Sequence, residues 1–154
     1  MSSSEFHDEI AIQIEAMTAT IAELVALHQD VSDRIPTVRE KTAASTFLAQ
    51  LYNGVENILK RVSYHCDVPL PIGETWHVDL FQRFISPTYA DLPPLLDSEL
   101  AASLAPYRRF RHVVFHGYGV QLDRKRMEQG VAGAADVFEK FKDNLDAYLD
   151  FVHR

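Results

Sequence analysis

Apolar residues recur every three to four positions along the first half of the chain, the spacing that places side chains on one face of an α-helix. The first stripe follows three serines at positions 2–4, and its helix should end near Asp30 to Asp33; its members are Phe6, Ile10, Ile14, Met17, Ile21 and Leu24. The second starts after Pro36 and reaches about Tyr64; its members are Val38, Ala43, Phe47, Leu51, Val55, Ile58, Leu59 and Val62. The two stripes predict two long helices that pack as an antiparallel hairpin.

Prolines divide the middle of the chain. A proline-rich loop around residue 70 precedes a predicted helix over residues 74–85, which directs four apolar side chains inward: Trp76, Leu80, Phe81 and Phe84. His77 and Asp79 belong to the same helix, and we expect both in solvent. Residues 86–94 contain three prolines and predict a second loop.

Asp97 and Pro106 each favour the start of a helix. Asp97 is a good N-cap for a short helix that continues to Leu104. Pro106 suits the first turn of the next helix, where its missing N–H would be unpaired in any case. We expect that second helix to end at His116, because the glycines at positions 117 and 119 favour a left-handed residue after a helix.

A last helix is predicted to follow Asp123, which can cap it. Its apolar face comprises Val131, Ala134, Phe138, Phe141, Leu145, Tyr148, Leu149 and Val152. Gly130 and Gly133 lie in a run of small residues, which suits close packing either beneath the 106–116 helix or against a second chain. We find no strand-like alternation and no repeat, so the chain predicts an all-α, up-and-down helical bundle of four main helices plus a short helix, in a single domain over residues 1–154.

Composition limits the location and the class of protein. The apolar share of 47% and the charged share of 24% are ordinary for a globular domain. Cys66 is the single cysteine, which excludes an internal disulfide and fits a reducing compartment. No apolar run approaches the roughly 20 residues of a membrane span. The acidic N-terminus lacks the layout of a signal peptide, so we predict a cytoplasmic protein with no membrane segment.

Charge is distributed unevenly along the chain. The net charge of −7 argues against a broad phosphate-binding surface. Between Tyr107 and Arg126, however, six basic residues face one acid, Asp123, for a local charge of +5 against −12 elsewhere. This local patch fits a small RNA footprint, or the solvated basic face that many helices carry.

The predicted 106–116 helix has two contrasting faces. A helical wheel at about 100° per residue places Tyr107, Phe110, Val113 and Val114 on one face, which should be buried. The other face carries Arg108, Arg109, Arg111, His112 and His116. Phe115 falls among these charges, where an aromatic needs a second chain to pack on or a base to stack on. Arg111 and His116 point about 140° apart, which suits a shallow groove between two copies of the helix.

The run from Arg111 to Tyr118, RHVVFHGY, resembles the R-x4-6-H signature of HEPN domains. With its tyrosine it resembles the RX4HXY form of HepT-like ribonuclease toxins. The position near the end of the penultimate helix of a small helical chain also matches that family. A second basic residue precedes the histidine in some related sequences, and here Phe115 takes that place, which leaves the local charge less positive.

The resemblance implies a metal-independent endoribonuclease without a cofactor, acting on RNA as the toxin of a toxin–antitoxin pair and working as a homodimer. In such enzymes the 2′-hydroxyl of the substrate attacks the neighbouring phosphate. The catalytic residues it implies are His116, as general base or acid, and Arg111, as the group that stabilises the phosphate in the transition state. The supporting or substrate-binding residues are His112, Tyr118, Arg108 and Phe115. Tyr118 is also a candidate for modification, since a partner nucleotidyltransferase antitoxin transfers a nucleotide to this tyrosine in HepT-like systems.

Other interpretations of the same residues stay open. Arg111 could pair with an acid of the last helix, such as Asp136 or Glu139, and His116 could be a satisfied histidine at a helix end. His112 and His116 have the spacing of two zinc ligands, but they lack the glutamate of a zinc hydrolase and arginines crowd them. The main alternative function is a non-catalytic HEPN-like module that binds a partner nucleotidyltransferase or a nucleotide.

Overall fold

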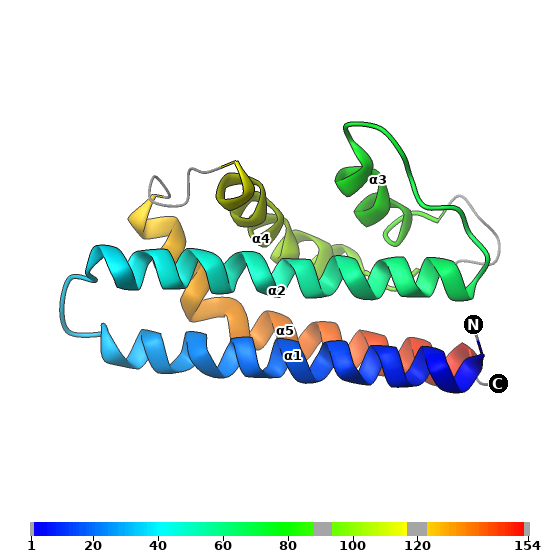
Figure 1. The fold of residues 1–154 in the computed structure, drawn as a ribbon, viewed down its shortest axis with the longest axis horizontal. Helices are drawn as coiled ribbons and strands as arrows, with labels where there is room; N and C mark the ends of the chain where they lie inside the picture. The colour runs from blue at the N-terminus through cyan, green and yellow to red at the C-terminus, as the bar shows by residue number, and fades with distance from the viewer. Residues whose placement is uncertain (1, 88–93, 117–122, 153–154) are drawn as a thin grey trace.

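Five α-helices account for most of the part of the chain described by a computed structural model, residues 2–87, 94–116 and 123–152 (Figure 1). They are α1 (Ser3–Asp30), α2 (Val38–His65), α3 (Trp76–Arg83), α4 (Ser98–Phe115) and α5 (Arg124–Val152). Four are long and α3 is short, so the predicted all-α bundle of four main helices plus a short helix is confirmed.

Local capping fixes where the long helices begin. The Ser2 hydroxyl accepts a hydrogen bond from the N–H of Glu5, whose carboxylate accepts one in return from the N–H of Ser2. Thr37 and Glu40 form the same reciprocal pair at the start of α2. Asp97 accepts a hydrogen bond from the N–H of Leu100 at the start of α4. Such caps accept hydrogen bonds from the first backbone N–H groups of the helix, which have no carbonyl acceptor within the helix itself.

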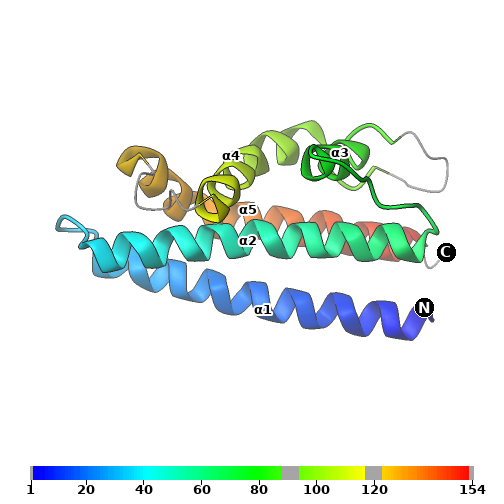
Figure 2. The same cartoon turned by 45° about the horizontal axis from the view of Figure 1, so that its top comes forward.

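Helix α2 is the centre of the bundle and contacts all four other helices. It forms an antiparallel hairpin with α1, while α5 runs beside both, and the C-terminal end of α5 lies close to the start of α1 (Figures 1 and 2). On the other side of α2 lie α4 and, near the C-terminal end of α2, the short α3. The fully buried apolar residues of α2 reflect this position: Leu48, Leu51, Tyr52, Val55, Ile58, Leu59 and Val62.

The predicted break before Pro106 is wrong, because α4 is one continuous helix with Pro106 inside it. Proline removes one backbone hydrogen bond, the one to the carbonyl of Ala102. Ala102 is exposed, so water can serve that carbonyl instead. The buried side chains on the two sides of the proline form one stripe at helical spacing: Leu100, Leu104, Tyr107 and Phe110. Packing of this stripe on α2 and α5 maintains the helix through the proline. Helix α3 is also two residues shorter at each end than predicted.

Gly130 explains the small-residue patch at the start of α5. A Cβ atom on Gly130 would lie 2.6 Å from Cε2 of Phe110, so a larger residue would collide with α4. The hydroxyl of Tyr107 donates a hydrogen bond to the carbonyl of Gly130 at 2.7 Å. Of the two uses considered for this patch, packing beneath α4 is therefore the one observed for Gly130.

We expect Gly130→Ala to lower the free energy of unfolding by about 1–2 kcal/mol, as the collision with the Phe110 ring exceeds the gain in helix propensity. Urea unfolding would measure this. Gly133→Ala is the matched control, because a Cβ there meets its nearest atom, the Tyr107 hydroxyl oxygen, at 3.4 Å. It should retain or gain stability, and a Gly130→Ala variant as stable as the wild type would contradict the packing argument.

Helix α1 is long and apolar enough, by length and composition alone, to cross a membrane. Its stripe of Phe6, Ile10, Met17 and Leu24 is buried in the bundle core. Only 17% of its most apolar 18-residue window is buried, however. The prediction that no apolar run approaches the length of a membrane span is therefore wrong for α1, and the absence of a membrane segment stays a prediction.

Candidate functional site

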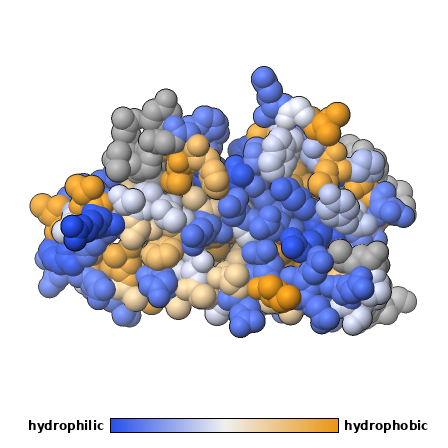
Figure 3. Space-filling model, in the orientation of Figure 1, coloured by the Kyte–Doolittle hydropathy of each residue, from blue (hydrophilic) through white to orange (hydrophobic). Residues whose placement is uncertain are grey.

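A cleft of about 460 Å³ lies between α3 and α4, with α2 beneath it. In the space-filling view the surface dips between these helices, and hydrophilic side chains predominate below the dip (Figure 3). Four arginines line the cleft: Arg108, Arg109, Arg111 and Arg126. Two carboxylates, Glu56 and Glu74, line it as well, so its lining carries net positive charge. An anionic ligand is the kind that such a cleft favours.

Arg111 is anchored in the cleft by α2. Its Nε donates a hydrogen bond to Oδ1 of Asn53 at 2.8 Å and lies 3.0 Å from Oε1 of Glu56. Its Nη1 lies 3.4 Å from Nε2 of His77, and 17% of the side chain is exposed. The anchoring contacts use mainly the Nε edge of the guanidinium. The other Nη donors have no protein partner in the described part of the chain and are free to bind an anion.

Glu56 is a carboxylate with 2% of its side chain exposed, and it is satisfied by two partners. Oε1 faces Arg111, and Oε2 lies 2.6 Å from Nδ1 of His77. Because a guanidinium can only donate, the N–H of Arg111 points to a lone pair on Nε2 of His77. We therefore assign the ring proton to Nδ1, which donates to Glu56. The prediction that His77 is solvated is wrong, since its side chain is 28% exposed and joins α3 to this cluster.

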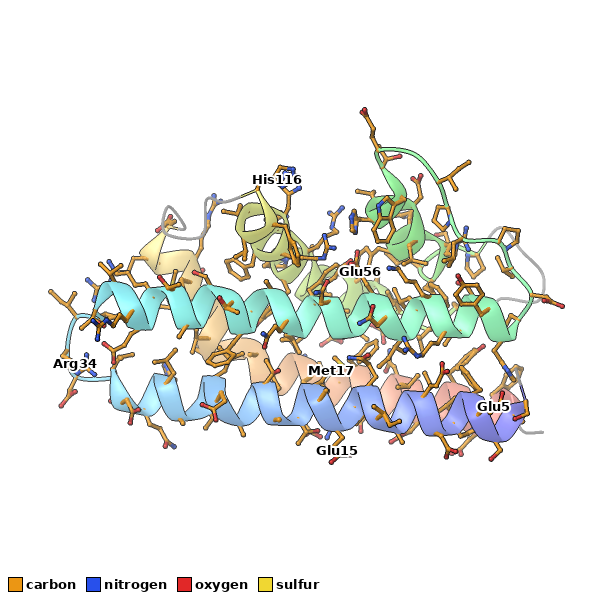
Figure 4. All side chains as sticks on the ribbon, in the orientation of Figure 1. Glu5, Glu15, Met17, Arg34, Glu56 and His116 are labelled. Atoms are coloured by element: carbon orange, nitrogen blue, oxygen red, sulfur yellow. The ribbon has the colours of Figure 1, made fainter. Side chains whose placement is uncertain are left out.

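His116 lies at the C-terminal end of α4, exposed and outside the residues that line the cleft (Figure 4). Its Nδ1 donates to the carbonyl of His112 at 2.7 Å, and the two imidazole rings are 4.1 Å apart. No hydrogen bond from Nε2 of His116 is found among the described residues, so this nitrogen is available for proton transfer. Within one chain, then, the cleft contains Arg111 and His112 but not His116.

Of the remaining predicted residues, Phe115 and Arg108 belong to the part of the chain that the structure describes, and each takes part in a cation–π contact. Phe115 is 58% exposed, and the guanidinium carbon of Arg111 lies 4.5 Å from its ring centre, a cation–π contact. The Arg108 guanidinium carbon lies 5.7 Å from the ring centre of Phe81, and its Nε is buried without a hydrogen-bond partner among the described residues. Tyr118 lies outside the described residues.

The alternative that Arg111 pairs with an acid is confirmed, but the acid is Glu56 and not one of the two suggested in the last helix. The acid comes from α2 and not from α5, because α2 is the helix beneath this face of α4. Asp136 and Glu139 of α5 are exposed, and Glu139 pairs with Lys142 of its own helix at 2.9 Å.

A metal site gains no support from the neighbouring residues. The described ranges contain no group of three or more His, Cys, Asp or Glu side chains that could hold an ion, so the pair His112 and His116 finds no third ligand there. His65 and Cys66 at the end of α2 are also residue types that bind metals, but both make other contacts. The His65 ring stacks on Phe6, and Sγ of Cys66 lies 3.3 Å from the hydroxyl of Tyr148.

Three residues of the site were not predicted from the sequence: Asn53, Glu56 and His77. One signal was present for Glu56, which is the single charged residue in the run 51–59. Seven positions of that run are buried, and a carboxylate on such a face must find a cation or hydrogen-bond donors.

A comparison with protein families places this site in a known context. A family model described as a HepT-like protein matches residues 43–152, which include α3, α4, all of α5 and most of α2. No curated protein and no solved structure matches the chain.

Proposed function

Since this chain belongs to the HepT-like protein family, we propose that it is a metal-independent endoribonuclease that acts as the toxin of a toxin–antitoxin pair. The proposal is supported chiefly by one feature, a cleft lined by four arginines in which Arg111 is fixed by its Nε edge. A phosphodiester of RNA is a ligand of matching charge and shape, because the guanidinium fork binds two phosphate oxygens at once.

The reaction that we propose is an internal transesterification. The 2′-oxygen of a ribose bonds to the adjacent phosphorus, and the bond from phosphorus to the 5′-oxygen of the next nucleotide breaks. One proton leaves the 2′-hydroxyl and one is added to the 5′-oxygen, so no oxidant, metal or water is consumed. Arg111 stabilises the additional negative charge on the phosphate oxygens, and His116 carries one of the two protons.

A homodimer would supply His116 to the cleft of Arg111. In one chain the two side chains do not meet, and the surface near His116 includes the exposed ring of Phe115. We propose that the C-terminal ends of two α4 helices face each other and that Phe115 packs in this interface. Each His116 then serves the Arg111 of the other chain.

Regulation by an antitoxin is the part of the proposal that depends on Tyr118. By resemblance to HepT-like systems, a partner nucleotidyltransferase would attach a nucleotide to its hydroxyl. The added phosphate would lie two residues beyond His116 and compete with RNA for the same arginines.

We expect the purified protein to cleave structured RNA in the presence of EDTA, and His116→Ala to slow this cleavage by about 10²- to 10⁴-fold, the range for loss of a proton-transfer group. Gel analysis of labelled RNA would measure both. His28→Ala, at an exposed histidine on α1, should cleave at the wild-type rate.

One observation favours the non-catalytic module instead. The carboxylate of Glu56 already neutralises part of the charge of Arg111. RNA or nucleotide binding without any cleavage, unchanged by His116→Ala, would support that alternative and contradict the ribonuclease.

A further inference from the structure

The proposed reaction needs two proton transfers, and the family motif provides one histidine for them. A base must take the proton of the 2′-hydroxyl while an acid gives a proton to the 5′-oxygen. In the described part of the chain the cleft lining contains two histidines, His77 and His112, and His77 is the one whose ring is held by a carboxylate. The following inference rests on the proposed function and concerns the role of this residue.

We propose that His77 is the general base of the ribonuclease, oriented by Glu56, and that His116 is the general acid. His77 comes from α3 of the same chain as Arg111, whereas His116 comes from the second chain. Each active site therefore combines a base and a phosphate-binding arginine from one protomer with an acid from its partner.

The hydrogen bonds around His77 set the ring in the state that a base requires. Nδ1 carries the proton and donates a hydrogen bond to Glu56 at 2.6 Å, so the lone pair is on Nε2, where it accepts a hydrogen bond from Nη1 of Arg111 at 3.4 Å. A substrate phosphate that takes over this N–H of Arg111 would free the lone pair for the 2′-hydroxyl. When Nε2 accepts a proton, the resulting imidazolium lies next to the guanidinium of Arg111 and faces the carboxylate of Glu56, which is 2% exposed and hence poorly screened, so that the carboxylate offsets the repulsion from Arg111. A buried carboxylate that holds one ring nitrogen thus fixes the tautomer and stabilises the product of proton transfer.

The position of Nε2 relative to Arg111 supports the same role. Nε2 lies 3.4 Å from Nη1 of Arg111, the group that we assign to the phosphate. A phosphate bound by the Nη groups would bring its own ribose within reach of Nε2. A base has to lie on the ribose side of the phosphate, and in this cleft His77 is adjacent to the phosphate-binding group.

Helix α3 is firmly attached, so the position of His77 is well defined. Leu80 is fully buried and Phe81 is 5% exposed, and both belong to the core cluster that includes α2. The nearest charged groups are Glu56 from α2 and Arg111 from α4, with Glu74 and Arg108 farther along the cleft lining. These groups would remain in place in a variant that lacks only the imidazole.

A change of leaving group separates the base from the acid. In a substrate with sulfur in place of the bridging 5′-oxygen, the thiolate departs without a proton, so the acid becomes dispensable while the base is still needed. We expect His77→Ala to slow cleavage of both substrates by about 10²- to 10⁴-fold. His116→Ala should be equally slow on the oxygen substrate and within about tenfold of wild type on the sulfur substrate.

A second variant at the same position tests whether the loss of activity comes from a disturbed structure. His77→Gln keeps an amide N–H that can donate to Glu56 but has no basic nitrogen, and it should be as inactive as His77→Ala. Added imidazole should restore part of the activity of His77→Ala, a response that a purely structural role would not produce.

The outcomes distinguish this inference from the proposed function. A wild-type protein that cleaves neither substrate overturns the proposed function and the role of His77 with it. A wild-type protein that is inactivated by His116→Ala but not by His77→Ala, or a His77→Ala variant that recovers on the sulfur substrate, overturns the role of His77 alone. Slow cleavage of both substrates by His77→Ala and His77→Gln, with rescue of the alanine variant by imidazole, supports it.

Discussion

Replacing Arg111 by alanine is expected to lower the rate constant of RNA cleavage by about a thousandfold or more, the effect seen when an arginine that stabilises a phosphoryl transition state is removed. The reason lies in the way the side chain is held. Asn53 and Glu56 fix its Nε edge, so the Nη groups are already in position and need not reorganise when charge develops on the phosphate. Single-turnover cleavage of a labelled RNA would measure the rate constant.

Two matched variants make this result specific. Arg111→Lys keeps a cation beside Glu56 and should therefore keep the fold, but it lacks the planar fork and should remain strongly impaired. Arg109→Ala removes an exposed arginine that also lines the cleft. It should weaken RNA binding in a salt-dependent way and leave the rate constant nearly unchanged. An Arg111→Ala variant that cleaves within tenfold of the wild-type rate would contradict the role of Arg111.

Replacing Glu56 by alanine is expected to lower the free energy of unfolding by about 3–5 kcal/mol, the cost of breaking a buried ion pair from one side. Glu56 joins α2, α3 and α4 through one side chain, since it contacts both Arg111 and His77. Its removal leaves the Arg111 guanidinium, 17% exposed, without a counter-charge. Urea unfolding would measure the loss.

The control for this prediction is an acid of the same type in a different environment. Glu15 is exposed on α1, and Glu15→Ala should change the stability by less than about 0.5 kcal/mol. Glu56→Gln, which keeps the shape and can still accept hydrogen bonds, should lose less than Glu56→Ala. A Glu56→Ala variant within 1 kcal/mol of the wild type, on the scale expected for such pairs, would show that the cluster does little for the fold.

The helices could be predicted from the sequence because their determinants are local. Reciprocal caps at Ser2 and Thr37 and the regular spacing of apolar residues act within a few positions of the chain. Pro106 was misjudged for the opposite reason. Its local preference is to start a helix, and the packing of a continuous apolar stripe on two other helices prevails over that preference.

The residues of the candidate site also divide into those that a local sequence pattern could identify and those that only the tertiary structure brings together. Arg108, Arg111, His112, Phe115 and His116 occupy one helix, where a motif and a helical wheel could identify them. Asn53 and His77 lie 58 and 34 residues before Arg111, and no local pattern links them to it. Their meeting depends on how α3 and α4 pack side by side on α2, which is a property of the tertiary structure.

The arrangement of His116 leads to the central claim that each site is built from two chains. One chain would provide Arg111 with its Glu56 anchor, and the other would provide His116. This claim predicts a form of complementation that no single variant can show, since two inactive proteins can form one intact site between them.

The most direct test is to mix the inactive variants Arg111→Ala and His116→Ala, allow their subunits to exchange, and measure RNA cleavage. About half of the dimers would then carry one subunit of each kind, and one of the two sites in each would be intact, so about a quarter of the wild-type activity should return. Activity no higher than that of the separate variants, in a mixture whose subunits have exchanged, would contradict the two-chain site.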